Sequence, residues 1–250
     1  STQGVSSAAS DVYKRQQLTP LGDQALVITL GDSIDPVVNR RLQTLIKEIR
    51  QANLPGIVAL IPAYSTLTVT YDGIVTNYDK LSHTLKPLID SSLSAPLATP
   101  TTWLIPVRYG GDGGPDLADV ANFADQSTGE VVQAHTDQDY LIYFLGFLPG
   151  FAYMGSVDDK IAMPRLAKPR LEIPAGSVGI AGKQTGFYPV ASPGGWRIIG
   201  QTPLNLYDPA HPQSFYSAGD RVRFFAVTDH EFDLIKTDVA NGTYQVKAVN

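Results

Sequence analysis

The chain has 250 residues, 43% of them hydrophobic, with a formal net charge of -5 and no cysteine. This length and apolar fraction are typical of a globular protein with one large domain or two small ones. The acidic balance excludes broad, non-specific nucleic-acid binding, and the absence of cysteine excludes disulfide scaffolds, thiolate nucleophiles and zinc–cysteine sites.

Residues 1–16 are small and polar and lack hydrophobic periodicity, so we expect a disordered tail there. The N-terminal residues do not show the basic-then-apolar pattern of a signal peptide. No apolar run approaches the roughly 20 residues that span a bilayer. Together with the lack of cysteine, these features favour a cytoplasmic protein without a membrane partner.

The first half alternates strand and helix patterns. Asp35 can cap a helix whose first turn holds Pro36, and Asn77 can cap another. In chain order, the predicted elements are a strand at 25–30, a helix from 35, strands at 57–61 and 66–71, a helix from 77 and a strand at 103–109. This β-α-β-β-α-β order is that of a ferredoxin-like unit. Residues 91–102 are rich in Ser, Pro and Ala, and we place the boundary of a first domain, residues 17–100, in this linker.

The second half, residues 101–228, changes character. Residues 116–124 form a short predicted helix, and Ser127 with Glu130 predicts a capping box for another. After Tyr140, short apolar runs are separated by Gly and Pro, which is typical of a β-barrel or a β-sandwich. Residues 229–250 are expected to form a mixed C-terminal extension with some strand-like alternation.

The search for metal and nucleotide motifs gives mainly exclusions. The four histidines are scattered without an H-x-x-x-H pair, so we predict no protein-bound metal. The segment from Gly176 to Lys183 is similar to a P-loop, but it has five residues between its outer glycines, and Gln184 replaces the Ser or Thr that binds magnesium. A Walker-type site is therefore rejected, although the glycines would let the backbone and Lys183 approach an anion.

Residues 161–207 are locally cationic, because this segment contains five cationic side chains and one acidic side chain, Glu172. The cations are Arg165, Lys168, Arg170, Lys183 and Arg197. Guanidinium groups on rigid loops are suited to carboxylate or phosphate, which they bind through a planar fork. The alternative is that these side chains are solvated at strand ends.

The loop at residues 146–155, GFLPGFAYMG, combines three glycines with three aromatic side chains. We expect it to provide the wall of a pocket for a flat ligand, or a patch that faces another polypeptide of a complex. The wall residues are Phe147, Pro149, Phe151 and Tyr153. A loop that only lines the core is the alternative.

Several long motifs point to one family. They are YGGDGGPDL, His135 with Tyr140, GFLPGFAYMG, PRLAKPRLEIPAGSVGIAGKQTGFYP and SPGGWRIIGQTPLNLYD, with LGDQALVITL near the start. In these motifs the chain resembles the family of 5-oxoprolinase B subunits, also called KipI or allophanate hydrolase subunit 1-like, from about Leu18 to Val227. One departure is Gln201, where the family usually has an arginine.

The resemblance implies an α+β protein with an N-terminal ferredoxin-like domain followed by a cyclophilin-like β-barrel domain. It also implies one subunit of an ATP-dependent 5-oxoprolinase, which converts 5-oxo-L-proline to L-glutamate and is inactive without the 5-oxoprolinase A subunit and a KipA-like C subunit. ATP, with its Mg²⁺, would be the co-substrate. The alternatives are an inhibitor of a sensor histidine kinase and a carboxyltransferase or allophanate hydrolase-type protein of urea metabolism.

The resemblance and the charge pattern together predict a site. We expect Arg165, Arg170, Lys183 and Arg197 to converge on one pocket that binds phosphate or a substrate carboxylate. Neutral hydrogen bonds would come from Gln184 and Tyr188. His135 is a candidate for proton transfer, with a structural histidine as the alternative.

Overall fold

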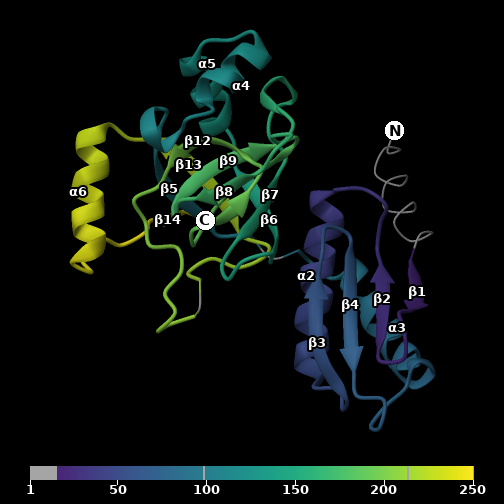
Figure 1. Ribbon diagram of the computed structural model, residues 1–250. Helices are drawn as coiled ribbons and strands as arrows, with labels where there is room; N and C mark the ends of the chain where they lie inside the picture. The colour runs from purple at the N-terminus through teal and green to yellow at the C-terminus, as the bar shows by residue number, and fades with distance from the viewer. Residues whose placement is uncertain (1–15, 98, 213, 250) are drawn as a thin grey trace, which may run out of the picture. The chain divides into compact units, whose positions relative to one another are not determined.

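The computed structural model describes residues 16–97, 99–212 and 214–249. The chain divides into two compact units between residues 98 and 99, and each has its own hydrophobic core (Figure 1). Apart from Gln16, the expected N-terminal tail lies outside the described residues.

The first unit is a four-stranded antiparallel sheet with the order β1-β2-β4-β3. Its elements are β1 (Gln17–Pro20), β2 (Ala25–Thr29), α2 (Pro36–Ala52), β3 (Ile57–Pro62), β4 (Thr66–Tyr71) and α3 (Tyr78–Ser94). Alternation along β4 buries Leu67, Val69 and Tyr71. Both helices cover the same face of the sheet (Figure 1).

The helix caps predicted from the sequence are confirmed. The Asp35 carboxylate accepts hydrogen bonds from the N–H groups of Val37, at 2.7 Å, and Val38, at 3.1 Å. The Asn77 side chain accepts one from the Lys80 N–H at 3.0 Å. These caps satisfy amide groups that have no partner inside the helix, which fixes where each helix begins.

The assignment of residues 103–109 to the first sheet is wrong. This segment is a strand, β5 (Thr102–Tyr109), but it pairs in parallel with β13 (Arg221–Ala226) in the second unit. The edge beside β2 is instead filled by β1, from Gln17 opposite Thr29 to Pro20 opposite Leu26. Strand propensity says that a segment is extended but does not identify the strand with which it pairs.

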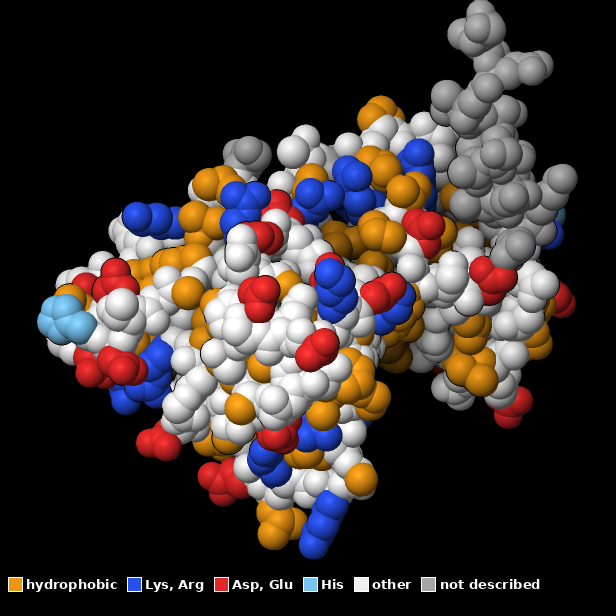
Figure 2. All heavy atoms as spheres, turned by 90° about the horizontal axis from the view of Figure 1, so that it is seen from above, with side chains coloured by type: hydrophobic (Ala, Val, Ile, Leu, Met, Phe, Trp, Pro, Cys, Tyr) orange, Lys and Arg blue, Asp and Glu red, His pale blue; other side chains and the backbone are white. Residues whose placement is uncertain are grey.

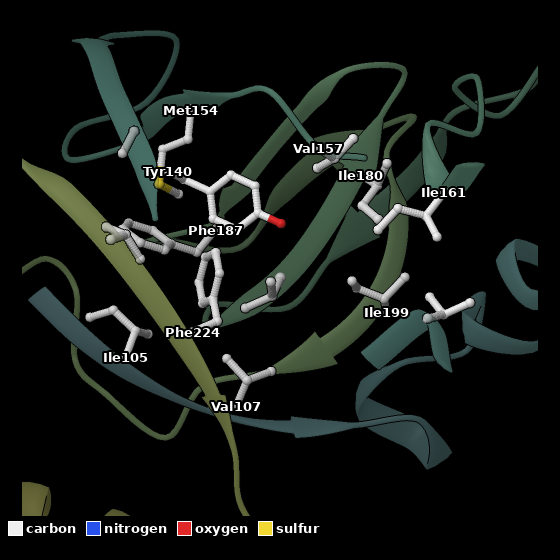
Figure 3. Close-up of a cluster of buried hydrophobic side chains, with 14 of the residues drawn as sticks. Ile105, Val107, Tyr140, Met154, Val157, Ile161, Ile180, Phe187, Ile199 and Phe224 are labelled. Carbon is white, nitrogen blue, oxygen red and sulfur yellow. The ribbon is translucent and has the colours of Figure 1, made fainter. Parts of the chain in front are cut away.

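The second unit contains a closed β-barrel, so the barrel alternative is confirmed and the sandwich is not observed. Among the described residues, seven strands form the ring, which closes where Gly200 lies opposite Tyr109. They are β5, β6 (Tyr140–Leu145), β7 (Ala152–Gly155), β9 (Ser177–Ala181), β10 (Gln184–Phe187), β12 (Arg197–Gln201) and β13. Figure 3 shows the buried side chains that these strands and their connections direct into the barrel interior, among them Ile105, Phe187 and Phe224.

Shorter elements surround the barrel. They are η1 (Gly111–Gly113), α4 (Leu117–Ala124), α5 (Thr128–Thr136), η2 (Asp159–Ile161), the ribbon of β8 (Arg170–Ile173) and β11 (Ser192–Gly194), α6 (Asp229–Ala240) and β14 (Ala248–Val249). The predicted capping box of Ser127 and Glu130 is present. No helix in the described part of the chain is long and apolar enough to cross a membrane.

The expectation of a mixed extension after residue 228 is wrong for its first half. Residues 229–240 form α6, which starts with a capping box between Thr228 and Glu231. The T-x-x-E pattern predicts such a helix start, but the apolar residues that follow it show only weak helical periodicity, so the helix was not predicted. Of the side chains of α6, Phe232 is buried.

Candidate functional site

Four aromatic side chains form a cluster beside one side of the barrel: Phe151, Tyr153, Tyr188 and Trp196, which we call the aromatic wall. The ring of Phe151 lies in its centre, with centroids 4.9 Å from Tyr153, 5.3 Å from Tyr188 and 5.3 Å from Trp196. All three contacts are edge-to-face, the geometry that aromatic quadrupoles favour. The wall therefore has a fixed shape, set by residues in or next to β7, β10 and β12.

The predicted wall residues are placed differently. Phe151 is buried and Tyr153 is half-buried in the aromatic wall. Phe147 is 63% exposed and meets the Phe151 ring edge-on at 5.6 Å. Pro149 is exposed in the same turn. Trp196 completes the wall but was not among the predicted site residues; the tryptophan in the SPGGWRIIG motif was the available signal.

Arg165 lies next to this wall. Its guanidinium carbon is 5.7 Å from the centroid of the Trp196 ring, and its Nη2 donates to Gln184 Oε1 at 3.4 Å. Within the described residues, Arg165 has no carboxylate at ion-pair distance. We call Arg165, Gln184 and the aromatic wall together the arginine–aromatic site. Three predicted binding residues, Arg165, Gln184 and Tyr188, are thus brought together.

The two tyrosines of the site are hydrogen-bond donors at neutral pH. Burial raises the pKa of Tyr188 to about 12, against the opposing effect of the positive charge of Arg165. Burial also raises the pKa of Tyr153, and Arg165 again opposes the shift. Arg165 is exposed, and Tyr153 and Gln184 are partly exposed, so they can bind an oxyanion such as a carboxylate through hydrogen bonds, whereas Tyr188 is 1% exposed.

The other three predicted cations are paired with carboxylates. Arg170 contacts Asp116 at 2.7 Å, Lys183 contacts Asp159 at 2.7 Å and Arg197 contacts Asp119 at 3.4 Å. Of the four cations that were expected to share one pocket, Arg165 is thus the one without a carboxylate partner among the described residues. The acids lie outside residues 161–207 in the sequence, but the fold brings them back to this segment. On the face in Figure 2, blue Lys and Arg side chains likewise lie close to red Asp and Glu side chains in several places.

The Asp116–Arg170 pair is the most enclosed of these ion pairs. Asp116 is 3% exposed and receives hydrogen bonds from Arg170 Nη1 at 2.8 Å and Nη2 at 2.7 Å. Its Oδ2 also accepts from the Ile198 N–H at 2.6 Å. The hydrogen bond to Asp116 raises the pKa of Arg170 above its usual value. Asp116 lies at the N-terminus of α4, but its side chain makes no capping hydrogen bond there.

The glycine-rich segment at Lys183 is a β-hairpin. Residues Ser177–Ala181 form β9, Gln184–Phe187 form β10, and Gly182 turns between them with a φ of 60°. A P-loop needs a helix after its glycines, so the rejection of a Walker-type site is confirmed. The Lys183 ammonium is exposed and paired with Asp159.

His135 lies in the barrel core and is 0% exposed. Its Nε2 is 2.8 Å from Thr185 Oγ1, and that hydroxyl donates to Gly179 O at 3.0 Å. Nε2 therefore carries the proton and donates, while Nδ1 accepts from Tyr109 Oη at 2.8 Å. Burial lowers the pKa of His135 to about 3. Both nitrogens are engaged by neutral partners, which is the environment of a structural histidine.

In the described ranges, no group of three His, Asp or Glu side chains is arranged to hold a metal ion.

Comparisons with known proteins identify relatives over most of the chain. The family model of the carboxyltransferase domain, subdomain C and D, matches residues 16–216. The 5-oxoprolinase B subunit of Bacillus subtilis (strain 168) is 38% identical over 235 residues, which cover 90% of this chain and 98% of that protein. The protein of the same name from Escherichia coli O157:H7 is 40% identical over 208 residues, 82% of this chain and 93% of that protein.

Solved structures are also similar. A conserved uncharacterized protein from Pyrococcus horikoshii is 45% identical, with a TM-score of 0.51, and the match covers 86% of this chain and all of that one. The urea carboxylase of Kluyveromyces lactis is 18% identical, with a TM-score of 0.75, and the match covers 94% of this chain and 24% of that one. The second likeness shows a shared fold.

Proposed function

Because the chain belongs to the family of carboxyltransferase subdomains C and D and of 5-oxoprolinase B subunits, we propose that it is the B subunit of an ATP-dependent 5-oxoprolinase. The complex would convert 5-oxo-L-proline to L-glutamate with ATP hydrolysis. Its other members would be an A subunit and a KipA-like C subunit, and the chain alone would be inactive. ATP, with its Mg²⁺, is the proposed co-substrate, and the cytoplasm is the proposed location.

We assign substrate binding to the arginine–aromatic site. The observation that carries this assignment is the position of Arg165 between the Trp196 ring and Gln184, without a carboxylate partner in the described part of the chain. 5-Oxoproline is a small lactam ring that bears one carboxylate. Its carboxylate would pair with Arg165, and its ring would lie against Tyr153, the partly exposed member of the aromatic wall.

The chemistry requires activation of a poor electrophile, the lactam carbonyl. Transfer of the γ-phosphoryl group of ATP to the lactam oxygen makes the lactam carbonyl carbon more electrophilic, and water then attacks this carbon. The C–N bond then breaks, nitrogen leaves as the amine, and a second water hydrolyses the acyl phosphate to glutamate and phosphate. The hydroxyls of Tyr153 and Tyr188 would donate hydrogen bonds to the negative charge that develops on oxygen.

The test is co-expression with the partner subunits, followed by an assay of glutamate release from 5-oxoproline with and without ATP. Arg165→Met keeps the aliphatic stem and removes the charge. The loss of a charge-assisted hydrogen bond of about 1.5–3 kcal/mol lowers kcat/KM roughly 10- to 100-fold. Lys168→Met, an exposed cation of the same segment, is the matched control. Full activity of Arg165→Met, or no ATP-dependent release from an assembled complex, would contradict the proposal.

The comparisons do not favour the other two functions. Three curated relatives with 36–40% identity are all named as the B subunit of 5-oxoprolinase.

We also assign the first unit to the ferredoxin-like folds. Its elements β2, α2, β3, β4 and α3 follow the β-α-β-β-α order, and β1 occupies the edge where the last strand of that fold would lie.

A further inference from the structure

The residues that carry the arginine–aromatic site come partly from irregular segments. Arg165 lies between η2 and β8, and Trp196 lies between β11 and β12. The two segments contact each other, because the Leu166 N–H donates to Gly195 O at 2.7 Å and the Arg165 guanidinium lies over the Trp196 ring. Loop segments of this kind need support from neighbouring elements to hold a ligand site in one geometry.

That support comes from α4. Asp116, at the start of the helix, and Asp119, three residues later, are neighbours on the helix surface. Each binds one arginine: Asp116 binds Arg170, and Asp119 binds Arg197.

Each arginine also reaches a backbone carbonyl of one segment. Arg170 Nη1 donates to Trp196 O at 3.4 Å, and Arg197 Nε donates to Pro164 O at 3.3 Å. One chain of contacts therefore runs from Asp116 through Arg170 to Trp196. The other runs from Asp119 through Arg197 to the residue before Arg165. A guanidinium can serve both partners at once because its five donors are arranged in a planar fork.

We propose that Asp116 and Asp119 are positioning residues of the arginine–aromatic site, and that each sets the place of one side of the site through its arginine. The ionic contacts at Arg170 and Arg197 then orient Trp196 and Arg165 and do not bind substrate. The functional part of this proposal rests on the proposed function. The structural part stands on the contacts alone and can be tested without substrate.

The decisive experiment measures the packing of Trp196 directly. The chain has two tryptophans, so Trp103→Phe leaves Trp196 as the one tryptophan, which can be excited selectively over tyrosine, and Trp196 is buried. In this background Arg197→Met removes both the Asp119 contact and the hydrogen bond to Pro164 O. Because Arg197 then no longer holds the segment that places Arg165 over the Trp196 ring, we expect a red shift of the Trp196 emission and stronger quenching by acrylamide. Unchanged emission and quenching in Arg197→Met would overturn the proposal.

Arg223→Met is the matched control, since it removes the Arg223–Asp139 pair of the same unit, which contacts neither segment. It should leave the Trp196 signal unchanged, and an equal response in both variants would also overturn the proposal. Asp119→Asn should shift the signal in the same direction as Arg197→Met, and Asp119→Glu, which keeps the charge, should restore it.

Activity of the reconstituted complex separates positioning from chemistry. Arg197→Met should raise the KM for 5-oxoproline about 10-fold and change kcat little, because the site is displaced while the reacting groups stay. A loss of kcat with unchanged KM would overturn the positioning role. If the native complex has no 5-oxoprolinase activity, the proposed function fails, and the Trp196 signal still decides the structural part.

Discussion

Replacement of Asp116 by alanine should destabilise the second unit by about 3 kcal/mol. The side chain accepts two hydrogen bonds from Arg170 and one from the Ile198 N–H. The orphaned N–H is buried and costs about 1–3 kcal/mol. Loss of a fully buried ion pair costs about 3–5 kcal/mol, but the Arg170 side chain is 32% exposed. Water takes over part of its solvation, so we assign about 1–2 kcal/mol to the pair.

The assay is urea unfolding of the second unit, followed by tryptophan fluorescence. In a unit of this size, a loss of about 3 kcal/mol also lowers Tm by roughly 6–12 °C. Asp119→Ala removes a more exposed pair at 3.4 Å and should cost less than about 1 kcal/mol. If the free energies of unfolding of Asp116→Ala and Asp119→Ala differ by less than about 0.5 kcal/mol, the claim that Asp116 makes a stabilising buried contact is refuted.

Two further predictions concern His135 and Gly194. The pKa of His135 is about 3 in the folded chain and near 6.5 when unfolded. Below pH 6.5 the unfolded state binds more protons than the folded state, so the free energy of unfolding is highest above pH 6.5 and decreases towards pH 3. His135→Phe should remove about 2 kcal/mol of this decrease between pH 7 and pH 5, measured by urea titration. An unchanged pH slope would contradict a buried neutral histidine. Gly194→Ala would place a Cβ 2.5 Å from Tyr188 Oη, so we expect at least about a 10-fold loss of kcat/KM in the complex. In Gly195→Ala the nearest atom is 3.6 Å away, and equal activities of the two variants would contradict a role for Tyr188.

Local signals in the sequence were sufficient for much of the fold. The caps at Asp35, Asn77 and Ser127 each form the predicted hydrogen bonds. Such contacts join residues two or three positions apart, and the sequence shows both partners together. The Gly- and Pro-punctuated apolar runs after Tyr140 likewise indicated the strands of a barrel.

Contacts between distant segments could not be read in this way. The edge of the first sheet is formed by β1, and β5 pairs with β13 more than one hundred residues later. Two arginines of the cationic segment, Arg170 and Arg197, are paired with Asp116 and Asp119, which lie at α4, more than forty residues earlier in the chain. The sequence named Arg165, Gln184 and Tyr188, which the structure places near one another. It could not say which arginines carry a free charge, because that depends on tertiary ion pairs.

The use of β1 as an edge strand has a consequence for engineering. Among the residues that the structure describes, the strand pairings of the first sheet all lie within residues 17–71, and those of the barrel lie within residues 102–249. A gene cut at residue 98 therefore severs no ladder on either side. We therefore expect that the two halves, expressed as separate polypeptides or recombined with halves from relatives, would each keep these strand pairings.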